Sequence, residues 1–169
     1  MSMNEPHLGS RSALRGYDYA VATSADDRLQ FFDVLVATEI ALWTAVDAAV
    51  MAATQVNLGL LSALRQIAVH DDRARVQDVA DGSGMTVGAA SKIVDRLERA
   101  GFVRRLPHPT DRRSSLLEMT AEGRAALKAG MRAARAELGR RTDTLSPDEL
   151  AETTKNLDAL RVAFGGRAD

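Results

Sequence analysis

The sequence predicts a mainly α-helical protein with one small β-hairpin. The 169 residues are enough to bury a substantial core as one domain, and aromatic residues make up only 4% of them. Apolar residues recur at helical spacing along most of the chain, whereas strand patterns are confined to segments near residues 102–106 and 114–119. We therefore expect several helices and a single hairpin.

Composition excludes several kinds of site. The chain contains no cysteine, so disulfides, thiolate metal sites and a thiol redox switch are excluded. Its three histidines, His7, His70 and His108, are too scattered to predict a catalytic or metal cluster. We therefore expect neither an enzyme nor a cofactor. No secretory signal opens the sequence, which favours a cytoplasmic location.

Charge is unevenly distributed, although the formal net charge is only -1. Residues 26–72 hold seven acidic and two basic side chains, whereas residues 73–113 hold nine basic and five acidic ones. A polyanion is therefore expected to meet the second segment and to avoid the first.

The N-terminal region predicts an arm followed by a long helix. Residues 1–25 lack sustained periodicity and contain Gly, Pro and Ser, which is typical of a mobile arm. A helix is expected over residues 27–54, with apolar residues on nearly every face. Asp33, Glu39 and Asp47 would be costly in a bilayer, so we expect a soluble helix and no membrane. Such a helix must be covered all round, most easily by a second subunit, which predicts a homodimer.

The middle of the chain, residues 58–120, predicts a helix-turn-helix followed by a β-wing. A helix over residues 58–70 comes first, and a short helix from Val76 and a Gly-containing turn follow. A longer helix is capped by Thr86 and stopped by Gly101, after which come the two strand segments. This order places a helix in the major groove of DNA and a loop arginine in the minor groove.

The C-terminal segment, residues 121–164, predicts two further helices. Thr120 caps the first of them, which is rich in alanine. The second begins with a capping box, in which Ser146 is the cap, Pro147 takes the first helical position and Glu149 closes the box.

The helix that follows Thr86 is expected to present its polar side to DNA. Val94 and Leu97 belong to an apolar face that should pack on the preceding helix. On the other side, small residues allow close approach, a lysine can reach a guanine edge or a phosphate, and a serine can do either more weakly. The alternative is that these cations are solvated and that Asp95 pairs with Arg99. The residues of this helix expected to contact DNA are Gly88, Ala89, Ser91, Lys92 and Arg96.

The loop between the two strand segments predicts a second contact with DNA. Pro107 and Pro109 cannot continue a strand ladder and force a projecting loop. Arg113 lies where the loop turns back, and an arginine there suits the narrow, electronegative minor groove. Asp111 can hold that arginine extended through a charge-assisted hydrogen bond. The alternative is a salt bridge between the two that only stabilises the loop.

At these residues the chain resembles the MarR family of winged-helix transcriptional regulators. The resemblance extends over about residues 28–164, because the order of the helices also agrees. Met119 stands where the family usually has leucine, which keeps the buried apolar role. The segments that carry the resemblance are the end of the recognition helix at 94–101, the wing at 111–113, and the runs 116–120 and 122–124.

The resemblance implies a single regulator domain over residues 26–169. Residues 27–54 and 121–164 would form the dimer, and residues 58–120 would form the DNA-binding lobe. Each subunit would present its recognition helix to one half of a palindromic operator. Family members usually repress, and they release DNA when a small aromatic or phenolic effector binds.

The family's functional residues map onto several positions of this chain. Ser91 and Lys92 match recognition-helix positions that meet DNA. Arg113 matches the minor-groove arginine, with Asp111 supporting it, and Arg112 matches a phosphate contact.

An effector pocket is expected between the dimer helices and the DNA-binding lobe. Trp43, Arg65 and His70 are the polar or aromatic residues near that crevice. Each also has a purely structural interpretation: Trp43 as interface core, Arg65 as a solvated or ion-paired residue, and His70 as a partner of the helix dipole. The predicted function is a dimeric, effector-responsive repressor, and the alternative is a winged-helix module that binds an acidic protein partner.

Overall fold

The structure is a computed structural model and describes residues 24–71, 73–110 and 114–165. It divides into two units, Met1–Ala37 and Thr38–Asp169, and each is described by itself. The arm predicted over residues 1–25 lies outside the described part of the chain, except for its last two residues.

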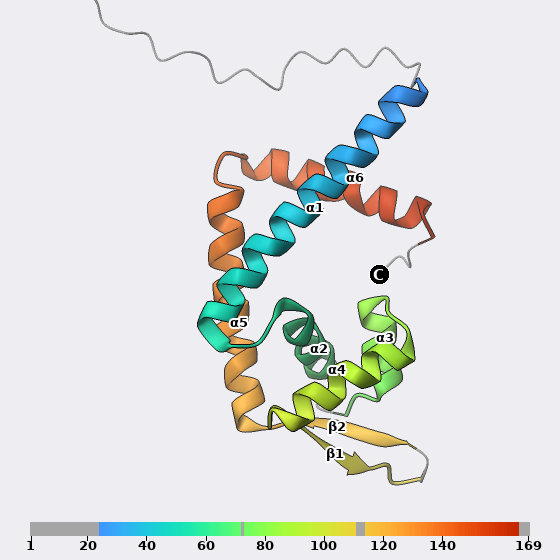
Figure 1. Cartoon of the computed structure of the whole chain (residues 1–169), viewed down its shortest axis with the longest axis vertical. Helices are drawn as coiled ribbons and strands as arrows, with labels where there is room; N and C mark the ends of the chain where they lie inside the picture. Colours follow the sequence, from blue (N-terminus) through green and yellow to red (C-terminus); the bar gives the residue numbers. More distant parts are fainter. Residues whose placement is uncertain (1–23, 72, 111–113, 166–169) are drawn as a thin grey trace, which may run out of the picture. The chain divides into compact units, whose positions relative to one another are not determined.

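The described elements follow the order expected from the sequence: two helices, a helix-turn-helix, a hairpin and two further helices (Figure 1). This confirms the mainly α fold with a small β-wing. The elements are α1 (Ala25–Thr54), α2 (Leu58–Val69), α3 (Val76–Ser83), α4 (Val87–Arg99), β1 (Val103–Pro107), β2 (Ser115–Met119), α5 (Ala121–Arg141) and α6 (Pro147–Ala163).

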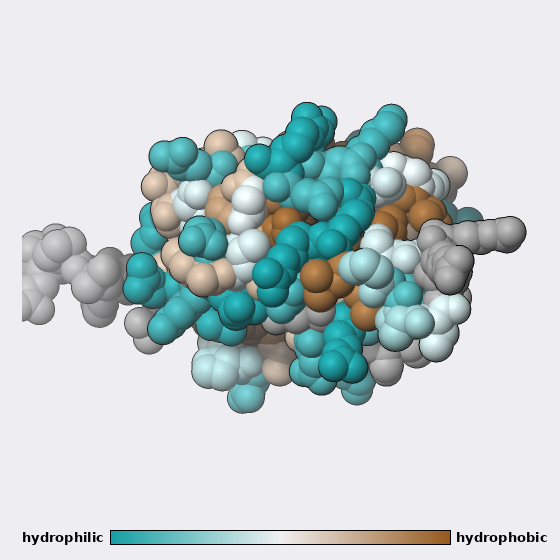
Figure 2. Space-filling view, turned by 90° about the horizontal axis from the view of Figure 1, so that it is seen from below, coloured by the Kyte–Doolittle hydropathy of each residue, from teal (hydrophilic) through white to brown (hydrophobic). Residues whose placement is uncertain are grey.

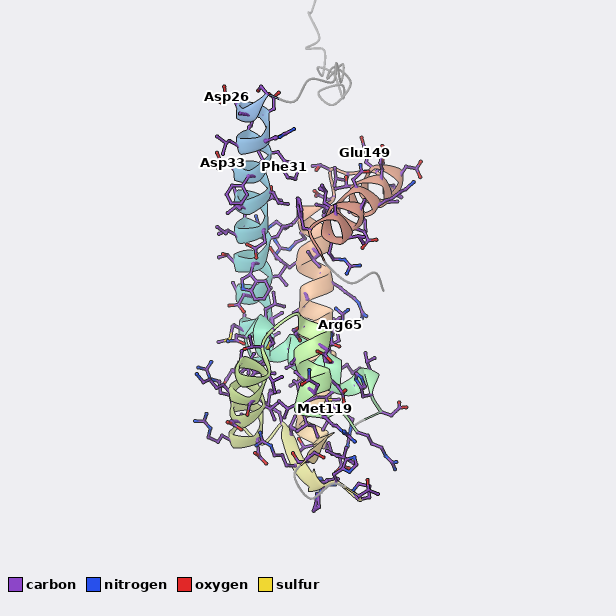
Figure 3. All side chains as sticks on the ribbon, turned by 90° about the vertical axis from the view of Figure 1, so that its right-hand side faces the viewer. Asp26, Phe31, Asp33, Arg65, Met119 and Glu149 are labelled. Atoms are coloured by element: carbon purple, nitrogen blue, oxygen red, sulfur yellow. The ribbon has the colours of Figure 1, made fainter. Side chains whose placement is uncertain are left out.

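Helix α1 begins two residues before its predicted start because of a local cap. The Asp27 N–H donates to Ser24 Oγ at 3.1 Å, and the Ser24 N–H donates to the Asp27 carboxylate at 2.8 Å. Large apolar side chains of the helix are exposed, among them Phe31, which lies near Asp33 at the start of the helix (Figure 3). By length and composition α1 could cross a membrane, although core helices of soluble proteins meet the same criterion.

The acidic residue Asp47 has a structural partner at the start of α2. Its carboxylate accepts a hydrogen bond from the Leu58 N–H at 2.6 Å, and Asn57 Oδ1 accepts one from the Leu60 N–H at 2.8 Å. The first N–H groups of a helix have no partner within the helix, so these two side chains satisfy groups that would otherwise need water.

A buried apolar cluster joins α2, α3, α4 and the hairpin. Val94 and Leu97 of α4 are fully buried in it, as predicted. Burial of each such side chain contributes about 1.5–3 kcal/mol. A second, smaller cluster joins Val50 of α1 to Leu61 of α2 and Ala134 of α5. The buried members of the first cluster are Ala63, Leu64, Ile67, Ala74, Val79, Ala80, Ala90, Val94, Leu97, Val103, Leu117 and Met119.

The hairpin is antiparallel, with Val103 opposite Met119 at one end and Pro107 opposite Ser115 at the other. The expectation that Pro107 lies outside the strand is wrong. It takes the last paired position of β1, where proline's missing N–H is tolerated. A third segment pairs with the hairpin, which the sequence analysis did not predict. The Leu117 N–H donates to the Ala74 carbonyl at 2.8 Å.

The start of α5 is held tightly against the end of the helix-turn-helix. Thr120 Oγ1 accepts from the Gly123 N–H at 3.0 Å and donates to the Gly101 carbonyl at 2.7 Å. A Cβ atom placed on Gly123 would lie 2.1 Å from the carbonyl oxygen of Phe102. Because that neighbour is backbone, only a glycine fits here without a shift of the chain.

We predict that Gly123→Ala lowers the free energy of unfolding by about 1–3 kcal/mol, the usual effect of overpacking. Gly139→Ala in the same helix is the matched control, because a Cβ there meets nothing within 4 Å. This control should gain up to about 1 kcal/mol from better helix propensity. Urea unfolding at equal protein concentration measures both effects. Equal stability of the two variants would contradict the close approach at Gly123.

Candidate nucleic-acid interface

Helix α4 has one buried side and one open side. Thr86 fixes its start by accepting a hydrogen bond from the Ala89 N–H at 3.3 Å. Gly101 ends the helical path in the left-handed region at φ 77°. Between these points the apolar residues face the core, so the rotation of α4 about its axis is fixed. On the open side, Gly88, Ala89, Lys92 and Arg96 are exposed and Ser91 is half-buried.

The open side of α4 suits close approach to a polyanion. A Cβ on Gly88 would meet nothing within 4 Å, so the first turn offers an unobstructed surface. Lys92, Arg96 and Arg99 place three cations along the next two turns. Figure 2 views the end of the molecule that carries α4 and the hairpin, where hydrophilic side chains surround smaller apolar areas.

The carboxylate of Asp95 forms an ion pair with strand β1 of the wing. Arg105 Nη2 lies 2.6 Å from Asp95 Oδ1, and Arg105 Nη1 contacts Glu98 Oε2. The ion pair considered between Asp95 and Arg99 is replaced by this arrangement, and Arg99 Nε donates instead to the Asp95 backbone carbonyl at 3.1 Å. Partial burial lowers the pKa of Arg105, but the hydrogen bonds and charges of the two acids outweigh it and raise that pKa above its ordinary value.

Sequence reasoning missed Arg105, although a signal was present. Val103 is buried at the start of β1, and side chains two apart in a strand share a face. Arg105 therefore lies on the inward face, whereas Arg104 lies on the outer one. Asp95 and Glu98, spaced by three residues, share a face of α4 and could have been matched to it.

The outer face of the hairpin carries a separate ion pair across the strands. Arg104 Nε donates to Glu118 Oε2 at 2.5 Å, and the two residues are register partners. The hydrogen bond from Arg104 lowers the pKa of the Glu118 carboxyl below its usual value. This pair links β1 to β2.

The wing residues Asp111, Arg112 and Arg113 lie outside the described part of the chain, so their roles stay predictions. The described start of the loop is connected to α3. Arg75 Nη2 lies 2.6 Å from His108 Nε2, and since a guanidinium only donates, the ring nitrogen accepts.

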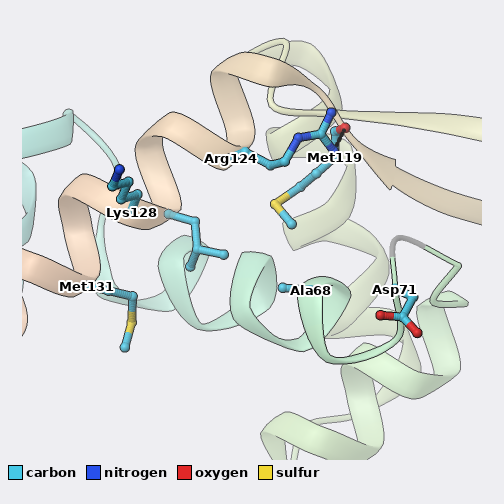
Figure 4. Close-up of a pocket in the computed structure, with 7 residues that line it drawn as sticks. Ala68, Asp71, Met119, Arg124, Lys128 and Met131 are labelled. Carbon is cyan, nitrogen blue, oxygen red and sulfur yellow. Dashed lines mark hydrogen bonds between the residues drawn. The ribbon is translucent and has the colours of Figure 1, made fainter.

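A cavity of about 470 Å³ lies between α2, the end of β2 and α5 (Figure 4). Arg124 and Lys128 supply its cations and Asp71 its acid. Arg124 Nη1 also donates to the Met119 carbonyl at 2.8 Å. Among the described residues, those lining the cavity are Ala68, Asp71, Met119, Arg124, Leu127, Lys128 and Met131.

The cavity lining includes none of the three residues predicted for the effector pocket. Trp43 lies with Glu39 and Ile40 in a smaller depression along α1, and it is 49% exposed. Arg65 is exposed on α2, and His70, at the C-terminal cap of α2, places Nδ1 2.9 Å from the Gln66 carbonyl. Their assignment to an effector pocket stays a prediction. Across the described ranges, no group of three His, Cys, Asp or Glu side chains could hold a metal ion.

Helices α3 and α4, followed by the β1–β2 hairpin, form a winged helix-turn-helix. Residues 56–115 match the model of the MarR family. A curated relative, the uncharacterized HTH-type transcriptional regulator YfiV of Bacillus subtilis (strain 168), is 29% identical over 90 residues, or 53% of this chain and 56% of the relative. The chain thus spans little more than half the length of that relative. The chain is thus similar to the MarR family over its winged helix-turn-helix segment, residues 56–115.

Solved structures share the fold over most of the chain. A MarR family regulator from Rhodococcus sp. RHA1 has a TM-score of 0.71 at 22% identity and covers 87% of this chain and 100% of its own. Sco3205 from Streptomyces coelicolor, solved in complex with DNA, has a TM-score of 0.72 at 21% identity, covering 85% and 91%. CouR from Rhodococcus jostii RHA1, bound to p-coumaroyl-CoA, has a TM-score of 0.69 at 24% identity, covering 88% and 100%. The Rhodococcus sp. RHA1 protein and Sco3205 are both described as MarR family transcriptional regulators.

Proposed function

We propose that this chain is a cytoplasmic, dimeric transcriptional repressor that binds a palindromic DNA operator. The observation that supports it best is the open side of α4, where cations and small residues stand on a helix whose rotation the core fixes. The DNA complex of the structurally similar Sco3205 agrees with this use of the fold. A dimer would present two such helices to two half-sites one helical turn apart.

Each predicted residue has a defined task in this proposal. Lys92 and Ser91 reach base edges or phosphates, and Arg96 contacts a phosphate further along α4. Gly88 and Ala89 allow the first turn to approach the groove. In the wing, Arg113 enters the minor groove with Asp111 holding it, and Arg112 binds a phosphate.

We predict that Lys92→Ala weakens binding to a duplex that the wild-type protein selects from a random library, by about 1–3 kcal/mol if Lys92 contacts a base. Lys155→Ala is the matched control, because it removes one exposed cation from α6 instead of α4. Fluorescence anisotropy over a range of salt measures the affinity. A flat salt dependence for the wild type would refute phosphate binding and favour the protein-interaction module.

The homodimer accounts for apolar surface that the single chain leaves uncovered. Scattered apolar side chains are normal on a protein surface, but these are concentrated on α1 and α6. A second copy packed on both helices would remove them from water. The exposed large apolar residues of these helices are Leu29, Phe31, Phe32, Val34, Val36, Ile40, Trp43, Met51, Leu150, Leu157 and Val162.

We predict that Ile40→Glu shifts the protein from dimer to monomer or to aggregate, because it places a charge in the proposed interface. Val69→Glu on α2 is the control, since Val69 is even more exposed, at 69% against 55%. Sedimentation velocity measures the molar mass of each variant. A wild-type monomer, or dimers of both variants, would contradict this interface.

We also propose that the 470 Å³ cavity receives the effector, and that the effector is an anion with an apolar or aromatic body. Arg124 and Lys128 lie four residues apart on α5, so they can face one anionic group. Met119, Leu127 and Met131 offer apolar and polarisable contacts to the rest of the molecule. The p-coumaroyl-CoA bound to CouR has this chemistry.

We predict that p-coumaroyl-CoA or free p-coumarate releases the protein from its selected duplex, and that Lys128→Glu raises the required concentration about tenfold, or about 1.4 kcal/mol. Arg65→Glu tests the pocket predicted from sequence by the same charge reversal on α2. Release titrations followed by anisotropy compare the variants. An effect of Arg65→Glu alone would move the effector site away from the cavity.

A further inference from the structure

A bidentate ion-pair cluster joins strand β1 to helix α4. Through its two terminal nitrogens, the Arg105 guanidinium holds Asp95 Oδ1 at 2.6 Å and contacts Glu98 Oε2. The three side chains are partly shielded from solvent, with exposed fractions of 27% for Arg105, 45% for Asp95 and 39% for Glu98. Because a guanidinium is a rigid planar fork of donors, the two contacts restrict both the distance and the orientation between strand and helix.

We propose that Arg105 is a positioning residue, which sets the orientation of α4 against the wing without contacting DNA itself. Its two terminal nitrogens are engaged by the acids of α4, and it shares the inward face of β1 with the buried Val103. Its neighbour Arg104 lies on the other face, with 64% of its side chain exposed. The inference rests on the proposed function, since the orientation of α4 matters only when that helix meets a duplex.

The two acids make the inference testable, because a simple charge argument predicts the opposite result. Carboxylates beside a duplex repel its phosphates, so removal of Asp95 and Glu98 charges would strengthen DNA binding if charge alone mattered. If the acids act by holding Arg105, their removal frees the fork and weakens specific binding instead.

Arg104 is a matched control on the neighbouring position of the same strand. It is also an ion-paired arginine, but its partner Glu118 lies on β2, so the pair does not connect the hairpin to α4. Loss of Arg104 removes the same charge from β1 and leaves the Arg105 cluster in place.

The experiment measures affinity, over a range of salt, for a duplex of about 30 base pairs selected by the wild-type protein from a random library. Arg105→Gln and the double variant Asp95→Asn/Glu98→Gln should each bind about ten- to a hundredfold more weakly, as when one good base contact is lost. Combining them should add no further loss, because both break the same cluster. Arg105→Lys keeps the charge without the fork and should also bind more weakly than the wild type. The salt slope should stay unchanged, since no phosphate contact is removed.

Three results would overturn the inference. The first is a double acid variant that binds as tightly as the wild type or more tightly. The second is additivity, in which Arg105→Gln weakens DNA binding as much in the double acid variant as it does in the wild type. Arg104→Gln is the control, because its loss of affinity is expected to be additive with that of the acid variant. The third is a salt slope smaller by about 0.9, which would make Arg105 a phosphate contact. Thermal unfolding verifies that each variant is folded, and Arg105→Lys replaces Arg105→Gln if the latter is not.

These failures are distinguishable from failure of the proposed function. If the wild-type protein enriches no duplex and binds DNA without salt dependence, the proposed repressor is refuted. If the wild type binds its selected duplex but the variants give one of the three overturning results, only the proposed role of Arg105 is refuted.

Discussion

Burial of one side of α4 is the constraint on which the proposed DNA-binding face depends. Ala90, Val94 and Leu97 are completely excluded from solvent, and they meet residues from α2, α3 and both strands in the same cluster. Successive residues of a helix are rotated by about 100°, so turning α4 by one residue would withdraw these side chains and bury polar ones. The open positions of Lys92 and Arg96 therefore follow from apolar packing on the opposite side of the helix.

Features encoded by neighbouring residues could be predicted from the sequence. Thr86, Thr120 and Ser146 each cap the helix that follows, as expected, because a cap needs only a side-chain oxygen and an N–H three residues later. The buried side of α4 was equally predictable, since its spacing follows the helical period. The start of α1 was missed because Ser24 stands at the end of a segment without periodicity, where its capping role had no pattern around it.

Features that depend on how elements pack could not be read in the same way. The partner of Asp95 is ten residues away on β1, and only the packing of β1 against α4 favours Arg105 over the helical neighbour Arg99. The pairing of Ala74 with Leu117 similarly joins segments that are distant in sequence. The cavity beside Lys128 arises from the approach of α5 to α2 and β2, which no single motif encodes. The buried and open sides of α4 were thus predictable from the sequence, whereas the contacts that hold α4 against the hairpin were not.

An effector in the cavity would act on the structure through a residue that the core and the cavity share. Met119 lines the cavity, belongs to the buried cluster and pairs with Val103 across the hairpin. Its carbonyl also accepts a hydrogen bond from Arg124, which itself lines the cavity. A ligand changes an equilibrium only by binding two conformations differently. Engagement of Arg124 by an anion would compete with its bond to Met119, at the end of the strand that pairs with β1 and its Arg105 cluster.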